Sequence, residues 1–355
     1  MNRLMRHPAG IRETRGFCQP RFSPPCPGGG SGRFREVFMF RSCVAFRLFA
    51  VFLALVWLNA AGASASPVPT NFALILPEKA VVDEAPQSAL NFTLDMLRPF
   101  LDPDFPRDHP TLALAMSTLE PFSGQALPMQ PPQSFTALHF RGEEAQRMEH
   151  LALVEEVMIY DQPGYRAVVP LPEAGAHHFV LQTKATWQPE ADRFVQHVSK
   201  VQVAALGSAE GWDRPAGLPF EIVPLSRPFG LCAGMSFTGQ VVREGKPVPG
   251  ARVEIAWLNS AVKPDMRPLP AAGQSPAPPK NRRSPRPAPY RATQELRADS
   301  QGVFTFACPR AGWWVFAASD AGDPLQDPEG QQKPLEIRTD FWVCFEPCRE
   351  GSRRP

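Results

Sequence analysis

Three histidines and two carboxylates in the middle of the chain are of the residue types that bind transition metals. His177 and His178 are adjacent, and Glu190, Asp192 and His197 follow them. Neutral imidazole suits Ni²⁺, Co²⁺ and Zn²⁺, and carboxylates can complete the coordination shell. Neighbouring residues of a strand point to opposite faces, so only one of His177 and His178 would lie beside His197. We predict a divalent metal site at these five residues, with three exposed or hydrogen-bonded surface histidines as the alternative.

Motifs of catalysis are missing from the sequence. It contains no Gly-x-Ser-x-Gly elbow, phosphate-binding loop or His-Glu-x-x-His pattern, and no Cys-x-x-Cys pair. The paired acids Glu143-Glu144 and Glu155-Glu156 are typical of a solvated surface. We therefore expect a protein that is not an enzyme.

The first 65 residues differ from the rest of the chain. Residues 1–38 are rich in Arg, Pro and Gly and predict a disordered or untranslated leader. Residues 39–65 then combine a basic start, an apolar run over 48–58 and the small residues 63–65, which is the pattern of a signal peptide. The apolar run is shorter than the ~20 residues of a permanent transmembrane helix. We expect cleavage near Ala65 and a periplasmic or secreted product, with an uncleaved anchor as the alternative.

Charge changes when this leader is removed. The full chain has 37 Lys and Arg against 35 Asp and Glu, a net charge of +2. Residues 1–65 hold nine arginines and the acids Glu13 and Glu36, which leaves 28 basic and 33 acidic residues and a net charge of −5 (28 − 33). Such a chain is compatible with a cationic ligand and does not favour nucleic acid.

Four cysteines remain after residue 65, at positions 232, 308, 344 and 348. An even number in an oxidising compartment allows two disulfides in three connectivities. Cys344 and Cys348 could close a small loop, which would leave Cys232 and Cys308 to pair with each other. Two free thiols at Cys232 and Cys308 fit the sequence equally well.

Short apolar and β-branched segments between Pro and Gly residues predict an all-β protein with two β-sandwich domains, Ig-like or prealbumin-like. The N-terminal sandwich covers residues 66–215. Within it, residues 143–156 could form a short helix, because their apolar positions do not settle the period. The predicted strands of this domain are 71–76, 89–94, 111–116, 134–140, 154–160, 178–182 and 198–205.

The C-terminal sandwich covers residues 216–345 and is followed by a tail over 346–355. A hairpin is predicted from strands 235–242 and 249–257, because the turn between them offers Gly245 for positive φ. Asp299 and Gly302 predict a second turn. The proline-rich, basic residues 263–289 are expected to be a disordered loop.

Two further expectations concern single side chains. The adjacent Trp313 and Trp314 should point to opposite faces of a strand. Arg227, in the segment that joins the domains, should pair with Glu221 or Asp213 through its planar guanidinium.

Several motifs lie between residues 187 and 318, namely Gly211-Trp212-Asp213, EIVPLSRPFGL at 221–231, GKPVPGA at 245–251, DSQGVF at 299–304 and PRAGWW at 309–314. These motifs resemble a periplasmic domain-of-unknown-function family associated with nickel and cobalt uptake. The resemblance implies a periplasmic β-sandwich that handles Ni²⁺ or Co²⁺ beside membrane transporter components. Asn71 and Arg98 stand where that family has histidines, so two imidazoles are absent here. The 245–251 motif is also similar to carboxypeptidase-regulatory-like sandwich modules, which are structural or adhesive.

Together these observations predict a secreted, non-enzymatic accessory or binding protein of the periplasm that is linked to nickel or cobalt uptake. The alternative is a structural or protein-interaction module of the cell envelope without a metal ligand.

Overall fold

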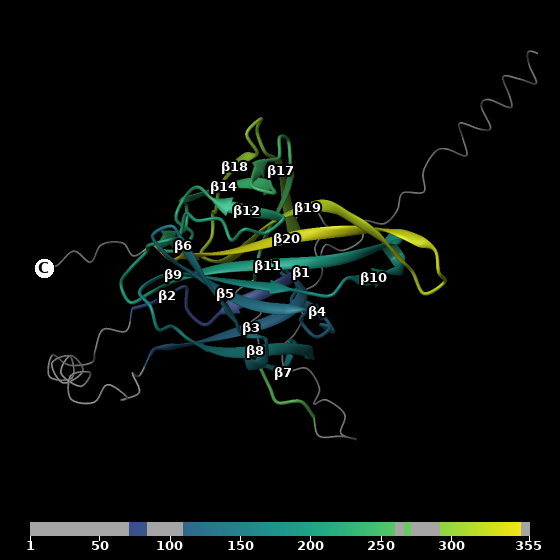
Figure 1. The fold of residues 1–355 in the computed structure, drawn as a ribbon, viewed down its shortest axis with the longest axis horizontal. Coiled ribbons are helices and arrows are strands. Elements are labelled where there is room, and N and C mark those ends of the chain that lie inside the picture. Colours follow the sequence, from purple (N-terminus) through teal and green to yellow (C-terminus); the bar gives the residue numbers. More distant parts are fainter. Residues whose placement is uncertain (1–70, 84–108, 260–265, 271–291, 349–355) are drawn as a thin grey trace, which may run out of the picture. The chain divides into compact units, whose positions relative to one another are not determined.

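The computed structural model describes residues 71–83, 109–259, 266–270 and 292–348 (Figure 1). The predicted leader, signal peptide, strand 89–94 and most of loop 263–289 lie outside these ranges. The regular elements of the described residues are strands, apart from two short 3-10 helices at Leu151–Leu153 and Pro189–Ala191. The predicted all-β class is confirmed. No helix in the described ranges has the length and hydrophobicity needed to cross a membrane.

The strands are β1 (Phe72–Pro77), β2 (Val81–Val82), β3 (Thr111–Glu120), β4 (Gln125–Leu127), β5 (Ser134–Arg141), β6 (Glu144–Glu149), β7 (Val154–Ile159), β8 (Gln162–Pro170), β9 (Gly175–Gln182), β10 (Thr186–Gln188), β11 (Arg193–Ala205), β12 (Phe220–Pro224), β13 (Leu231–Cys232), β14 (Ser236–Arg243), β15 (Lys246–Pro247), β16 (Arg252–Trp257), β17 (Thr293–Arg297), β18 (Val303–Ala307), β19 (Gly312–Gln326) and β20 (Gln332–Glu346).

A large central sheet has the strand order β17-β16-β19-β20-β11-β9-β5-β6. Its long strands β19, β20 and β11 run side by side (Figure 1). β20 pairs antiparallel with β19 and parallel with β11. The predicted boundary between residues 215 and 216 stays a prediction, but strands from both sides of it belong to this one sheet.

Two smaller sheets complete the fold. The first contains β1-β3-β8-β7, with β4 attached to β3, and the other contains β12-β14-β15, with β18 attached to β14. We call the apolar cluster shared by the β1 sheet and the central sheet the first core, and the cluster shared by the β12 sheet and the central sheet the second core. The arrangement is that of two sandwiches with a common middle sheet.

Successive side chains of the central strands point alternately into the first core and the second core. Val315 of β19 and Trp342 of β20 belong to the first core. Their neighbours Phe316, Phe341 and Val343 belong to the second core. Because successive side chains of a strand point to opposite faces, one strand can serve two cores without a change in its hydrophobic pattern. The predicted opposite orientation of Trp313 and Trp314 is confirmed in the same way, since they pack against the first and second core respectively.

The predicted hairpin of 235–242 with 249–257 is wrong beyond its turn. Gly245 has the positive φ that the predicted turn requires, and Glu244 has a positive φ as well, but the strand that returns from this turn to pair with β14 is only the two-residue β15. β16 instead lies in the central sheet between β17 and β19. Val253 and Ile255 of β16 thereby meet Phe237 of β14 face to face across the second core, so burial of both apolar faces places the strands in opposite sheets.

The structure also tests the predicted turn at Asp299 and the conformation of residues 143–156. The Asp299 turn is confirmed, because the Asp299 carboxylate accepts hydrogen bonds from the amides of Gln301 (2.8 Å) and Val303 (2.9 Å). Residues 143–156, whose sequence allows either a helix or a strand, form β6, one 3-10 turn and the start of β7. β6 alternates in burial and pairs with β5 as an edge strand.

A buried ion pair joins β11 to β12. Lys200 Nζ donates to Glu221 Oε2 at 2.7 Å, and both side chains are almost fully buried. The Glu221 carboxylate also accepts the amides of residues 216–218 at 3.1, 3.1 and 3.3 Å. The prediction that Arg227 pairs with Glu221 is therefore wrong, because Lys200 occupies that carboxylate and Arg227 lies over the ring of Phe229.

Candidate functional site

The register of β9 and β11 separates the predicted histidines. His178 lies opposite Gln202 and His177 lies opposite Val203. His197 precedes Gln202 by five positions on β11, which is about 17 Å along an extended strand. His197 therefore does not lie beside His177 or His178.

His178 is fully buried and uses both ring nitrogens within the protein. Nε2 donates to the Gly211 carbonyl at 2.9 Å, and Nδ1 accepts a hydrogen bond from the Gln202 amide at 3.3 Å. Burial, together with the charge of Lys200, lowers the pKa of His178 to about 3. This imidazole is neutral and holds the 211 turn against the sheet.

His177 lies beside His139, a histidine that is not among the predicted site residues. His139 of β5 is its cross-strand neighbour, and their ring centroids lie 4.9 Å apart. Nε2 of His177 donates to the Glu173 carbonyl at 2.9 Å, and Nε2 of His139 to the Ala174 carbonyl at 3.1 Å. Burial lowers the pKa of His177. The two rings fasten the turn that precedes β9.

The two predicted acidic ligands lie elsewhere. Glu190 belongs to the Pro189–Ala191 turn, and Asp192 follows it with a left-handed backbone. The Asp192 carboxylate accepts a hydrogen bond from Lys333 at 2.7 Å. The five predicted residues are thus not gathered into one shell. In the part of the chain that the structure describes, no group of three or more His, Cys, Asp or Glu side chains is arranged to hold a metal ion.

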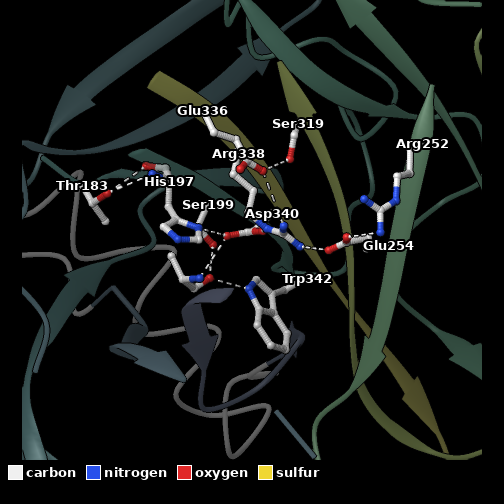
Figure 2. A network of polar contacts seen from close by, with 11 residues as sticks. Thr183, His197, Ser199, Arg252, Glu254, Ser319, Glu336, Arg338, Asp340 and Trp342 are labelled. Carbon is white, nitrogen blue, oxygen red and sulfur yellow. Dashed lines mark hydrogen bonds and ion pairs between the residues drawn. The ribbon is translucent and has the colours of Figure 1, made fainter. Parts of the chain in front are cut away.

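His197 takes part in a different polar network, shown in Figure 2. Its Nδ1 donates to Asp340 Oδ2 at 2.7 Å, and the same oxygen accepts the Ala73 amide at 3.0 Å. The backbone amide of His197 donates to Thr183 Oγ1 at 3.0 Å. Because the carboxylate can only accept, the Nδ1 nitrogen carries the proton and Nε2 is left for another partner.

Arg338 is the buried cation of this network. Its guanidinium bonds to Glu254, lies 3.4 Å from Asp340 Oδ1 and contacts the face of Phe72. Burial acts to lower the pKa of Arg338, but the charges of Glu254 and Asp340 raise it above its ordinary value. Three carboxylates, including Glu336 at 3.9 Å, therefore surround one guanidinium.

A cavity of about 520 Å³ opens over this network, and we call it the His197 cavity. Two arginines on its wall are partly exposed. Arg193 Nε lies 3.1 Å from Glu336, and Arg252 bonds to Glu254 and Glu295. Its lining residues are Asn71, Gln188, Arg193, Val195, His197, Arg252, Glu254, Ala317, Ala318, Ser319, Asp320, Ala321, Pro334, Leu335, Glu336 and Arg338.

The hydroxyl of β11 that lies closest to His197 in the chain has another partner. Ser199 lies two residues along β11, but its hydroxyl donates to the Ala73 carbonyl at 2.8 Å. Within the described ranges no hydroxyl or thiol bonds to His197 Nε2, as nucleophilic catalysis would need. The cavity offers guanidinium groups, the carboxylates that are paired with them and one imidazole, and such a lining can bind a small polar ligand.

The strands, cores and polar cavity define an all-β sandwich protein. A family model described as "Domain of unknown function (DUF4198)" matches residues 101–322, which is more than half of the chain. The chain belongs to this family. No curated protein matches in sequence.

The solved structures that match this chain are remote in both sequence and structure. Salmonella alpha-2-macroglobulin reacted with methylamine is 13% identical, covers 79% of this chain and has a TM-score of 0.21. A marsupial T cell receptor is 8% identical, and the match covers 77% of this chain and 73% of the receptor chain with a TM-score of 0.18. The chain spans 15% of the length of the alpha-2-macroglobulin.

Proposed function

We propose that the protein is a secreted, non-enzymatic binding protein of the cell envelope whose ligand occupies the His197 cavity. The observation that carries this proposal is the buried network of Arg338, Asp340 and His197 beneath an open polar cavity. Burying charged groups is costly unless they are paired. A pre-organised polar floor of this kind is typical of a ligand site.

The ligand that fits best is a small polar molecule with a carboxylate. Arg193 and Arg252 line the cavity with about half of each side chain exposed. Guanidinium groups match carboxylates through paired N–H donors, and such charge-assisted bonds are strong. His197 can add one contact through Nε2.

A divalent transition metal is the second candidate ligand, and one observation favours it. Metal-bound histidines commonly donate their other ring nitrogen to a carboxylate, as His197 does to Asp340. The rest of the cavity fits a cation poorly, because Glu254 and Glu336 are held by arginines. Position 71, which lines the cavity, is Asn here. A role in nickel or cobalt uptake beside a transporter depends on this weaker candidate.

The alternative is an interaction module of the envelope that binds no small ligand. Isothermal titration of the purified protein separates the three possibilities, with L-glutamate, succinate, Ni²⁺ and Co²⁺ each used as a probe. We expect a carboxylate to bind with Kd below about 1 mM. Arg252→Gln should weaken that binding about tenfold or more, because a charge-assisted bond is lost.

Arg166→Gln is the matched control, since Arg166 pairs with Glu155 on β7 and does not line the cavity. It should leave carboxylate binding unchanged. Metal binding that disappears in His197→Ala would support the second candidate instead. If none of the four probes binds, the cavity is not a ligand site of either kind.

A further inference from the structure

Two of the four cysteines that follow residue 65 lie together where β13 meets the end of β20. Cys232 is the second residue of β13 and is the register partner of Glu346 in a parallel pair. The Ala233 amide donates to the Glu346 carbonyl at 2.8 Å, which fixes this alignment. Cys348 follows two residues after Glu346. The backbone therefore carries both cysteines to the same corner of the central sheet.

Their thiols lie close to each other at this corner. Cys348 Sγ donates to the Ala233 carbonyl at 3.1 Å, next to Cys232 in the chain. A hydrogen bond between the two thiols is the main cause that raises the pKa of Cys232. Cys232 is partly exposed and Cys348 is exposed, so both sulfurs are open to reagents.

The other two cysteines are placed differently. Cys308 is completely buried in the second core, and burial raises its pKa. Cys344 alternates on β20 with Val343 and Phe345, which both face the second core. Its side chain therefore lies on the other face of the sheet from Cys308. A bond between Cys308 and Cys344 would have to pass through the sheet.

We propose that Cys232 and Cys348 form a disulfide in the oxidised protein, and that Cys308 and Cys344 stay free. This selects one bond from the three connectivities that the sequence allows. A small-molecule or protein disulfide is the oxidant. The Cys348 thiolate attacks one sulfur of the oxidant and displaces a thiolate, and the Cys232 thiolate then attacks the mixed disulfide and displaces the second. The two cysteines lose two electrons and two protons, and the oxidant is reduced to two thiols.

The bond would fasten the end of β20 to β13. Phe345, one residue before Glu346, is buried in the second core, and Leu231 beside Cys232 belongs to the same core. A cross-link over such a long chain segment restricts the unfolded state strongly. Closing it should therefore raise the thermal unfolding midpoint.

The test is disulfide mapping of the purified protein after equilibration with glutathione disulfide. Unreduced peptides should show a link between Cys232 and Cys348 with the loss of two hydrogens, while Cys308 and Cys344 are alkylated after unfolding. A link between Cys344 and Cys348 or between Cys232 and Cys308, or alkylation of all four cysteines, would overturn the proposal.

A second measurement uses variants. Reduction with dithiothreitol should lower the unfolding midpoint of the oxidised wild-type protein, and Cys232→Ser or Cys348→Ser should abolish this difference. Cys344→Ser is the matched control and should retain it. Loss of the difference in Cys344→Ser but not in Cys232→Ser would contradict the assignment.

Discussion

At the scale of single residues, burial decides what the histidines do. His178 is enclosed and held at both ring nitrogens, whereas His197 has one nitrogen on Asp340 and lies at a cavity wall. The same residue type thus holds a turn on β9 and, under our proposal, contacts the ligand on β11. Sequence spacing alone does not separate these roles, because both histidines lie in apolar strands.

The stability of the protein should depend on pH through His178. Its folded pKa of about 3 lies below the ordinary value of 6.5. Between these two values the unfolded chain binds a proton that the folded chain does not. The free energy of unfolding should therefore fall as the pH is lowered from 6.5 towards 3, by about 1.4 kcal/mol per pH unit for this group.

Chemical denaturation at several pH values measures this slope. His178→Gln keeps an amide that can donate to Gly211 and removes the titration, so its slope should be shallower. Equal slopes for the wild-type protein and His178→Gln would show that His178 does not titrate in this way.

At the scale of elements, the Lys200–Glu221 pair connects β11 to β12. The carboxylate is saturated by one ammonium and three backbone amides. It holds the turn at 216–218 against the central sheet where one predicted domain passes into the next. Such a connection is specific, because either charge left alone would be buried without a partner.

Glu221→Gln should therefore destabilise the protein by about 3–5 kcal/mol, because Lys200 loses its counter-charge in a buried place. The free energy of unfolding in urea measures this loss. Arg141→Gln removes an ion pair with Glu173 that is largely exposed, and it should have little effect. A Glu221→Gln variant as stable as Arg141→Gln would mean that Lys200 finds water or another partner.

At the scale of the whole described fold, one residue of β1 ties two sheets together. The Ala73 amide donates to Asp340, and the Ala73 carbonyl accepts hydrogen bonds from Ser199 and from Trp342 Nε1 at 2.8 Å each. β1 belongs to the smaller sheet and the three side chains belong to the central sheet. The polar network of the cavity is thus also a joint between layers.

The two sides of this joint should respond differently to mutation. Trp342→Phe leaves the Ala73 carbonyl bonded to Ser199, so the lost hydrogen bond should cost only about 1 kcal/mol, plus the change in packing. Asp340→Ala leaves the Ala73 amide and His197 without their acceptor and removes a counter-charge from Arg338. The free energy of unfolding should therefore fall by about 3–5 kcal/mol. Unfolding in urea compares the two variants, and equal losses would argue against the joint.

Much of the fold can be predicted from local sequence. Short runs of apolar and β-branched residues between Pro and Gly predict β1, β3, β5, β7 and β11, because such a run is a property of near neighbours in the chain. The turns at 243–246 and 299–302 are equally local, since Gly and Asp act within a few residues. β8 was missed, although its burial alternates, because Pro163 and Gly164 interrupt its start.

The partners of each strand and the site are matters of tertiary structure. His197 was selected from its residue type, but its partner Asp340 lies 143 positions away. Neither Arg338 nor Arg252 could be predicted as a cavity residue, because the sequence around an arginine does not show whether its side chain is buried or exposed. The sequence by itself determined that the protein is built of strands and where they turn, because strand and turn formation depend on near neighbours. Only the tertiary structure decided that β16 and β14 lie in different sheets, that His177 and His178 lie apart from His197, and that a charged cavity forms over Arg338. All three depend on how segments that are distant in the sequence pack together.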